Sequence, residues 1–534
     1  MKKLILLVFC LLFLFLQNRC AKRGVPSGGE KDTIPPVMIK ASPKQKSIFF
    51  DKEIITLTFD EYIKLNEIDK QLIISPPLEK SFYDIKPKIS ASKKIEIKLL
   101  KPLEENTTYT FNFGKSIQDN NEANELSYFS YALSTGESID SLELNGKISD
   151  AINKEVSPVI SLQLYPIDST YNDSTIFLKK PLYVSISDSL NFKFENLRAG
   201  IYELIAIEDF GGNYFFDQNI DKIGFLDKTI EIPKDTFAEL VLFKEITNFG
   251  WGIPKYINDH HVEFPYYGDY INDEITLKNI VDEDFRFLIN EHRTKDTLNF
   301  WYSNPTKFDS LIFNLKIKDT SKTVIVKPKK IIKDSLVIKN IQKKFLNLSD
   351  SIIIESNLPL LNLNSENIKI LDVDSLQVDF KLSMDENFDR FYININPLPN
   401  DNYRVILNPD SVEDLWYNTN KKLEFSLKTK SVEDYGIIII QLQGDIPVSY
   451  FIELLDFKGK VIRKKLGDTL NDSYTFSNLE PGKYNLRLIK DSNMNNKWDT
   501  GNYLKKINPE KVIYLPKVID LRANWEINEI FLVN

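Results

Sequence analysis

Short runs in which apolar and polar residues alternate one by one recur along most of this chain. Examples are residues 54–59, 95–99, 109–113, 313–317 and 484–488. Successive side chains of a β-strand point to opposite faces, so a period of two predicts strands with one buried face. The runs are rich in β-branched and aromatic residues, and turn residues separate them about every 8 to 12 positions, which is typical of β-sandwiches. No later segment has a sustained helical apolar stripe, so we predict an all-β fold.

The composition limits both the number of domains and the function. At about 150 residues per domain, 534 residues predict roughly three to five domains. Hydrophobic residues make up 42% of the chain, enough for several cores. The formal net charge of -8 argues against nucleic acid as a partner. The cysteines are Cys10 and Cys20 alone, which excludes C-x-x-C metal or redox chemistry.

Two segments of the sequence repeat each other without a gap. Residues 194–217, FENLRAGIYELIAIEDFGGNYFFD, align with residues 476–499, FSNLEPGKYNLRLIKDSNMNNKWD, at an offset of 282. A weaker repeat lies upstream of each copy, where Tyr109, Leu133 and Thr135 match Tyr403, Leu427 and Thr429. The chain therefore reads as a pair of modules, A then B, followed by a spacer module and a second pair.

The first A module carries Pro35-Pro36-Val37, Phe59-Asp60-Glu61, Ile74-Ser75-Pro76-Pro77, Asn106-Thr107-Thr108-Tyr109 and Leu133-Ser134-Thr135-Gly136. This set resembles the bacterial Ig-like domains of surface proteins, and more closely those that open lipoproteins of Bacteroidota. Each B module carries F-x-N-L-x-x-G-x-Y-x-L, which resembles the carboxypeptidase regulatory-like, transthyretin-like sandwich. That family consists of accessory modules, so the resemblance implies no peptidase activity. In this motif we expect Leu beneath a tight turn, Gly supplying the positive φ, and Tyr starting a strand.

The predicted organisation is a tandem array of about five Ig-like or transthyretin-like β-sandwiches, strung like beads. The predicted segments, in chain order, are a signal peptide (1–19), a lipidated flexible tether (20–33), the first A module (34–138), the first B module (139–246), the spacer module (247–335), the divergent second A module (336–431) and the second B module (432–534).

The N-terminus reads as an export signal that ends at a cysteine. Lys2 and Lys3 precede the apolar run 4–16, which is too short to span a bilayer comfortably but has the length of a signal peptide core. Cys20 follows at the expected cleavage point, and this resembles a bacterial lipoprotein signal. The resemblance implies that Cys20 is acylated and anchors the protein to outer-membrane lipid. The alternative is an uncleaved anchor helix with an incidental cysteine. The sequence does not determine which face of the outer membrane the protein occupies.

One loop of the second B module is a candidate metal site. Asp491, Asn493, Asn495 and Asp499 occupy positions 1, 3, 5 and 9 of DSNMNNKWD, where oxygen ligands can surround Ca²⁺. Asn496 stands where such loops prefer Gly, and two carboxylates imply weak affinity. The first copy keeps Asp209, Asn213 and Asp217 but has Gly211 at position 3, which weakens the prediction there. The alternative for both loops is a hairpin that uses Asp and Asn as turn residues.

Two other groups of residues are candidates for binding. His260-His261 could hold a metal, but adjacent residues on a strand point to opposite faces, so packing within the spacer module is the better explanation. The five tryptophans could stack on sugars, but they are scattered over several modules, which favours core or rim positions. We find no catalytic motif and predict no catalytic residue.

These observations predict a non-catalytic, membrane-anchored envelope lipoprotein. Its role would be structural or interactive: a rod that holds binding surfaces away from the membrane, or an accessory subunit of an outer-membrane protein assembly or secretion complex. Other envelope proteins would be its partners. The alternative is a cell-surface protein that binds or processes glycans, which would need exposed aromatics or paired carboxylates in one groove.

Overall fold

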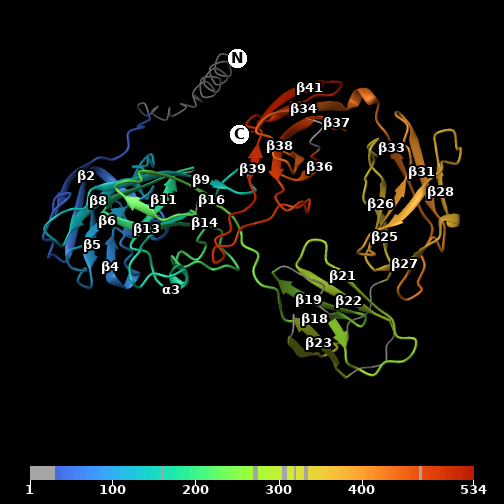
Figure 1. Cartoon of the computed structure of the whole chain (residues 1–534), viewed down its shortest axis with the longest axis horizontal. Coiled ribbons are helices and arrows are strands. Elements are labelled where there is room, and N and C mark those ends of the chain that lie inside the picture. Colours follow the sequence, from blue (N-terminus) through green and yellow to red (C-terminus); the bar gives the residue numbers. More distant parts are fainter. Residues whose placement is uncertain are drawn as a thin grey trace, which may run out of the picture.

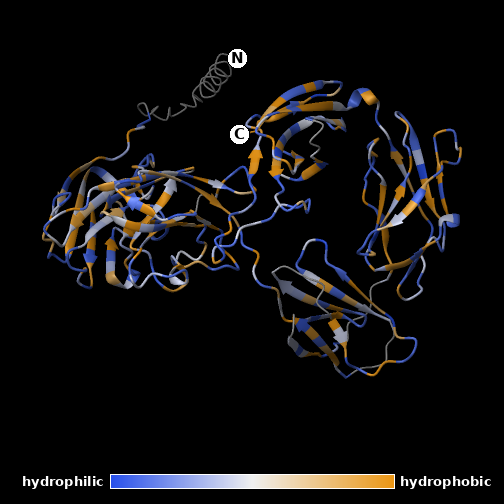
Figure 2. Ribbon diagram, in the orientation of Figure 1, coloured by the Kyte–Doolittle hydropathy of each residue, from blue (hydrophilic) through white to orange (hydrophobic). Residues whose placement is uncertain are grey.

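The computed structural model describes residues 31–533, apart from 158–159, 189, 269–274, 304–308, 318–319, 330–334 and 468–471. The regular structure of these residues is almost entirely strand. The helical segments are short: α2 (Ile68–Gln71), α3 (Thr175–Leu178), η1 (Lys80–Phe82), η2 (Ser365–Asn367) and η3 (Val432–Asp434). The strands form five sandwiches in chain order (Figure 1), and apolar and polar residues alternate along them (Figure 2). The predicted all-β tandem array is thereby confirmed.

The first A module packs two sheets around one core. One sheet has the order β1-β2-β5-β4 with β7 beside β2, and the other has the order β3-β6-β8. Phe59, Tyr109 and Phe111 are among its buried residues. Its strands are β1 (Met38–Ser42), β2 (Ile54–Leu65), β3 (Ile73–Ser75), β4 (Tyr83–Lys86), β5 (Ser92–Leu99), β6 (Thr108–Asn112), β7 (Ile117–Asp119) and β8 (Ser130–Ser134).

The first B module is one continuous sheet in the order β14-β13-β10-β11-β12-β9-β16, with β15 beside β13. The last strand, β16, runs parallel to the first, β9, while the other pairs are antiparallel. Its strands are β9 (Leu142–Asp150), β10 (Ser161–Pro166), β11 (Tyr183–Asp188), β12 (Asn191–Leu197), β13 (Gly200–Ile207), β14 (Ile223–Phe225), β15 (Ile230–Ile232) and β16 (Phe237–Leu242).

The spacer and second A modules are likewise built from stacked antiparallel sheets. The spacer strands are β17 (Gly250–Trp251), β18 (Lys255–Asn258), β19 (His261–Tyr267), β20 (Ile275–Leu277), β21 (Phe287–Glu291), β22 (Thr297–Tyr302), β23 (Leu311–Ile317) and β24 (Thr320–Val326). The second A module has β25 (Ile338–Asn340), β26 (Ile352–Ser356), β27 (Leu360–Leu363), β28 (Ile368–Leu371), β29 (Lys381–Met384), β30 (Arg390–Asn394), β31 (Asn402–Leu407), β32 (Val412–Asp414) and β33 (Leu423–Lys428).

The second B module repeats most of the strand pairing of the first, but its strands form two sheets, β37-β34-β41 and β36-β35-β38-β39 with β40 beside β38, where the first forms one. Its last strand again runs parallel to its first strand, β34, while β35 pairs antiparallel with β38, as β10 does with β13. Its strands are β34 (Gly436–Gly444), β35 (Tyr450–Asp456), β36 (Val461–Leu466), β37 (Ser473–Leu479), β38 (Gly482–Lys490), β39 (Val512–Tyr514), β40 (Ile519–Leu521) and β41 (Glu526–Val533).

The two A modules make equivalent contacts at the residues that match in the weak repeat. Tyr109 lies opposite Leu133, and Tyr403 lies opposite Leu427. The Tyr109 hydroxyl accepts the Glu104 N–H at 3.1 Å, and the Tyr403 hydroxyl accepts the Leu398 N–H at 2.7 Å. Equivalent strand pairs therefore end in the same kind of loop contact.

The modules do not form an extended rod. The spacer contacts the second A module through a small cluster around Trp301, Leu358 and Leu415. The second B module then returns to the first, and Tyr503 lies in one buried cluster with Phe225 and Phe243. Four modules thus close into a ring, with the first A module attached outside it (Figure 1). The expected string of beads was wrong in this respect, because contacts between modules have no periodic signature in the sequence.

Candidate functional site

The F-x-N-L-x-x-G-x-Y turn joins modules and has the same geometry in both copies. Asn196 and Asn478 have φ of 59° and 52°, whereas neither Gly200 nor Gly482 has a positive φ. The expectation that Gly supplies this conformation was wrong, because Asn also tolerates the left-handed region and here sits at a register shift of the strand.

The other two expectations for this motif hold. Leu197 and Leu479 are each about 1% exposed beneath the turn. Tyr202 and Tyr484 lie near the start of β13 and β38, and their hydroxyls donate to backbone carbonyls of the turn at 2.9 and 2.7 Å.

The same turn docks each B module on its own A module. The Asn196 amide donates to Thr110 Oγ1 at 2.9 Å, and the Asn478 amide donates to Ser349 Oγ at 2.8 Å. Two residues later, Arg198 Nη2 donates to the Asn106 carbonyl of the first A module at 2.9 Å, and in the second copy Glu480 pairs with Lys430 of the second A module. The positive φ points the asparagine side chain out of its own module, so one turn serves folding and docking together.

The candidate calcium loop is folded around its first aspartate. Asp491 is 1% exposed, and its two carboxylate oxygens accept the N–H groups of Asn495 and Asn496 at 3.1 and 2.8 Å. The side-chain amides of Asn493 and Asn495 both donate to Asp499, at 2.7 and 2.9 Å. The structure brings the four predicted residues together, but calcium would require both amides to turn their oxygens inward. Calcium binding here stays a prediction.

The first copy has the same loop backbone with different side chains. Asp209 accepts the N–H groups of Asn213 and Tyr214, the positions that match Asn495 and Asn496. Tyr214 and Asn496 share a φ near 60°, at 67° and 60°, so the position where calcium loops prefer Gly is left-handed in both copies.

Sequence reasoning missed Glu510, which stabilises the second loop from outside. Its carboxylate accepts the Ser492 N–H at 2.6 Å and the Asp499 N–H at 3.1 Å, and its carbonyl accepts the indole N–H of Trp498 at 3.0 Å. Glu510 lies beyond the repeated segment, so no comparison between copies could point to it.

The second copy departs from the first directly after this loop. The copies align at an offset of 282 up to Asp499, but β39 and β40 follow β14 and β15 at an offset of 289. The second copy is therefore seven residues longer here. Residues 498–508, which contain this insertion, lie against the first B module, and we call them the clasp.

Aromatic side chains form the centre of the clasp contact. Tyr503 is fully buried, with its ring 5.4 Å from that of Phe225 and 6.4 Å from that of Phe177. Its hydroxyl lies 3.1 Å from that of Tyr171. Burial raises the pKa of the Tyr503 hydroxyl, so this group stays protonated. Trp498 packs at the edge of the same cluster.

Polar groups surround this aromatic centre. The Lys506 ammonium lies 3.1 Å from Asp173 and 3.3 Å from Glu203, both on the first B module, and 3.9 Å from the Tyr503 ring centroid. The Tyr503 N–H donates to the Glu245 carboxylate, and the Thr500 hydroxyl donates to the Lys244 carbonyl at 2.6 Å.

Gly501 permits the close approach of the clasp. A Cβ at Gly501 would lie 2.7 Å from the Phe243 ring and 2.5 Å from the Ile507 carbonyl oxygen.

A second contact between the B modules lies beside the clasp. Arg487 Nη1 donates to the Ile152 carbonyl at 2.7 Å, and the Tyr514 hydroxyl donates to the same oxygen at 2.7 Å. Glu453 holds the other side of the Arg487 guanidinium at 2.6 and 2.8 Å. Closure of the ring thus rests on two neighbouring contacts.

The remaining candidate side chains have packing roles. His261 stacks on Trp301 with ring centroids 3.7 Å apart, and its Nε2 lies 3.1 Å from Asn299 Oδ1. His260 Nδ1 lies 3.0 Å from the Tyr302 carbonyl. Trp251 and Trp301 are buried, while Trp525 is half-exposed under Arg522. The structure therefore does not gather the tryptophans into one surface.

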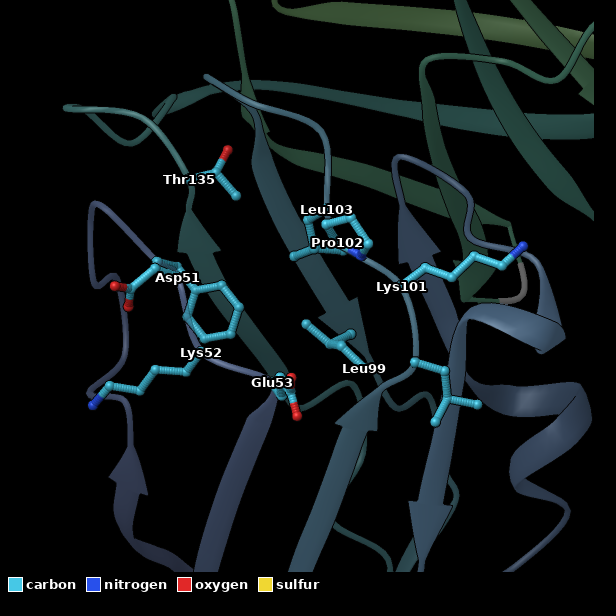
Figure 3. A pocket seen from close by; sticks show the side chains of 10 residues that line it. Asp51, Lys52, Glu53, Leu99, Lys101, Pro102, Leu103 and Thr135 are labelled. Carbon is cyan, nitrogen blue, oxygen red and sulfur yellow. The ribbon is translucent and has the colours of Figure 1, made fainter.

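A hollow of about 320 Å³ lies at one end of the first A module, between the loops that flank β2 and β5 (Figure 3). Asp51, Lys52, Glu53 and Lys101 line its rim. Thr135 also lines the hollow, and its hydroxyl donates to the Glu104 carbonyl at 2.7 Å. The hydroxyl is thus already part of the strand-end contact shared by both A modules.

Cys20, the predicted lipidation site, lies outside the described residues. Among the described residues, no helix is long and apolar enough to cross a membrane. The same part of the chain holds no group of three His, Cys, Asp or Glu side chains placed to bind a metal ion. The calcium loop, with two carboxylates and two amides, is a different class of site.

The comparison with protein families identifies one module. Residues 32–135 match the bacterial Ig-like domain, which agrees with the resemblance seen in the first A module. Because this match covers less than half of the chain, it assigns the first A module alone to the bacterial Ig-like domains. No curated protein matches significantly.

The solved structures that match parts of this chain include an alpha-2-macroglobulin, an S-layer protein and a pilin subunit. Native alpha-2-macroglobulin from Escherichia coli, spanning domains MG0-NIE-MG1, is 12% identical over 34% of this chain and 71% of that chain, with a TM-score of 0.18. The S-layer protein rSbsC(31-844) is 10% identical over 92% and 68%, with a TM-score of 0.16. BcpA, the major pilin subunit of Bacillus cereus, is 11% identical over 73% and 99%, with a TM-score of 0.14. None of these scores indicates a shared arrangement of modules.

Proposed function

We propose that this chain is an envelope lipoprotein, anchored to the outer membrane through acylated Cys20, that acts as a non-catalytic scaffold for other envelope proteins. The observation that carries the proposal is the array of Ig-like sandwiches, whose candidate polar residues are used in contacts within and between modules. Because function depends on specific sites rather than on the fold, the use of these polar side chains in module contacts supports a scaffold role.

The anchor is tested by membrane fractionation of cells that express the full chain. Two acyl chains make membrane attachment stable, whereas one is marginal. Cys20→Ser is expected to release the protein from the membrane fraction and to abolish incorporation of labelled palmitate. Cys10→Ser is the matched control and should change neither. Retention of Cys20→Ser in the membrane would contradict lipidation and support an uncleaved anchor helix.

The partner is proposed to be an assembly or secretion complex of the outer membrane. Extraction in mild detergent and affinity purification should recover a stoichiometric integral outer-membrane protein. Recovery of the chain alone would count against a subunit role. Binding of polysaccharides in a screen would favour the glycan-binding alternative, and protease treatment of intact cells would decide which membrane face the protein occupies.

A further inference from the structure

We propose that the clasp, residues 498–508, is a releasable intramolecular lock that sets this chain between a closed ring and an open, extended form. The inference goes beyond the scaffold role, because it concerns how the array changes shape. It rests on where the insertion lies, on which core the clasp belongs to, and on the fit between its two sides.

The insertion is dispensable for the B fold. The first B module builds the same strand pairings with seven fewer residues at this place. A feature present in one copy and absent from the other therefore does not serve the shared architecture. The clasp residues that follow Asp499 contact the first B module through Thr500, Tyr503 and Lys506.

The clasp also stands apart from the core of its own module. The buried core of the second B module, around Ile438, Leu486 and Phe531, does not include Trp498 or Tyr503. These two side chains pack instead with Phe225 and Phe243 of the first B module. The clasp can therefore separate from the first B module while the main hydrophobic cores of both B modules stay intact.

The fit of the clasp is specific. The Lys506 ammonium lies between the carboxylates of Asp173 and Glu203, and the Tyr503 ring packs against Phe225. A methyl group at Gly501 would collide with Phe243. Because the two sides are linked through the intervening modules, closure is intramolecular and needs a smaller interface than the association of two separate chains.

The test is disulfide formation across the closed contact in the intact chain. Asn508 Nδ2 lies 2.5 Å from Asp227 Oδ1, so Asp227→Cys and Asn508→Cys would face each other across the contact and could be joined, by a disulfide or by a short bifunctional thiol reagent, only while the ring is closed. Cys10→Ser and Cys20→Ser remove the natural thiols. The product is read on a non-reducing gel as a monomer of altered mobility, and compactness is read from elution volume.

Gly501→Ala should slow the cross-link by about tenfold or more and shift elution toward a larger radius, because overpacking disfavours the closed form. Gly482→Ala is the matched control, since the nearest atom to its added Cβ lies 4.0 Å away. It should leave both readouts unchanged. Lys506→Ala should slow the cross-link, while Lys505→Ala, whose ammonium forms no ion pair with a described residue, should not.

Circular dichroism of each variant guards against unfolding as the cause. Equal cross-linking in Gly501→Ala and Gly482→Ala, with folded protein in both, would overturn the proposal. So would cross-links that join two chains rather than one, because the contact would then be intermolecular.

Discussion

The two B modules share most of their strand pairing and differ in length at the loop that follows the buried aspartate. Both use the Asn-Leu turn with a left-handed asparagine, a parallel first and last strand, and a loop folded around a buried aspartate. The second copy then adds seven residues, and these reach back to its sister module. The longer loop of the second copy is therefore what brings the two B modules into contact at the clasp.

The shared features of the two B modules belong to their common fold, whereas the longer loop is particular to the second copy. Features present in both copies should matter equally for stability in each. Features present in one copy should affect shape or ligand binding and leave the fold intact.

The largest effect is expected at the shared leucine beneath the turn. Leu197→Ala and Leu479→Ala should each destabilise their own module by about 3 kcal/mol, because both leave a cavity in a close-packed core. Hydrogen exchange with mass spectrometry resolves the two modules in the intact chain. Leu190→Ala and Leu466→Ala, at half-exposed positions, are matched controls that should cost much less. A clear difference between Leu197 and Leu479 would break the equivalence of the copies.

A smaller effect is expected at the left-handed asparagine. Asn196→Ala and Asn478→Ala should each cost about 1–2 kcal/mol, because alanine disfavours positive φ and the amide bond to the A module is lost. Asn→Gly at either position restores the backbone and removes the hydrogen bond alone, so it should cost less than Asn→Ala. Thermal unfolding of the four variants measures this. Equal losses for Ala and Gly would show that docking, and not φ, dominates.

Calcium should distinguish the two aspartate loops. If the second loop binds, its two carboxylates predict a Kd of about 10⁻⁴–10⁻³ M by isothermal titration calorimetry, with a stabilisation of about 1 kcal/mol at ten times that concentration. Asp499→Asn should abolish the signal, whereas Asp217→Asn in the first copy should not. Titration heat that survives Asp499→Asn would exclude this loop as the site.

The smallest effect is expected from pH at the clasp. Burial raises the pKa of the Glu203 carboxyl, and the Lys506 ammonium opposes this only in part; Asp173, Tyr171 and Tyr503 are the other titratable groups that face it. A carboxyl whose pKa is higher in the closed form binds a proton on closing. Closure should therefore strengthen slightly as pH falls from 7 toward the raised pKa and weaken as pH rises through it.

Cross-linking rates at several pH values, corrected for thiol ionisation with a reference disulfide, measure this dependence. Glu203→Gln should flatten it. A closed fraction that falls on acidification in the unsubstituted chain would reverse the expected sign.

The sequence predicted those features that depend on local periodicity or on repetition. Alternation predicted the strands, and the repeat predicted that Leu197 and Leu479 occupy the same buried position. The motif also located the turn correctly but assigned its positive φ to Gly200 and Gly482. Glycine is the usual residue for that conformation, and the sequence alone does not show that the asparagine four positions before each glycine adopts it instead.

Contacts between distant modules were beyond sequence reasoning. Tyr503 reads as one aromatic residue in a polar loop, and nothing near it names Phe225 or Phe243, which lie more than 250 positions away. The gapless alignment ended at Asp499, so the seven added residues fell just past the point where the copies were compared. Glu510 was missed for the same reason.

The closed ring has a mechanical consequence. A pulling force between the first B module and the second A module can travel along two parallel load paths, one through the spacer module and one through the clasp and the second B module. The load is shared until the clasp ruptures, after which the spacer path carries it alone. The protein should therefore resist stretching stiffly at first and then yield in one step that releases length while every sandwich stays folded.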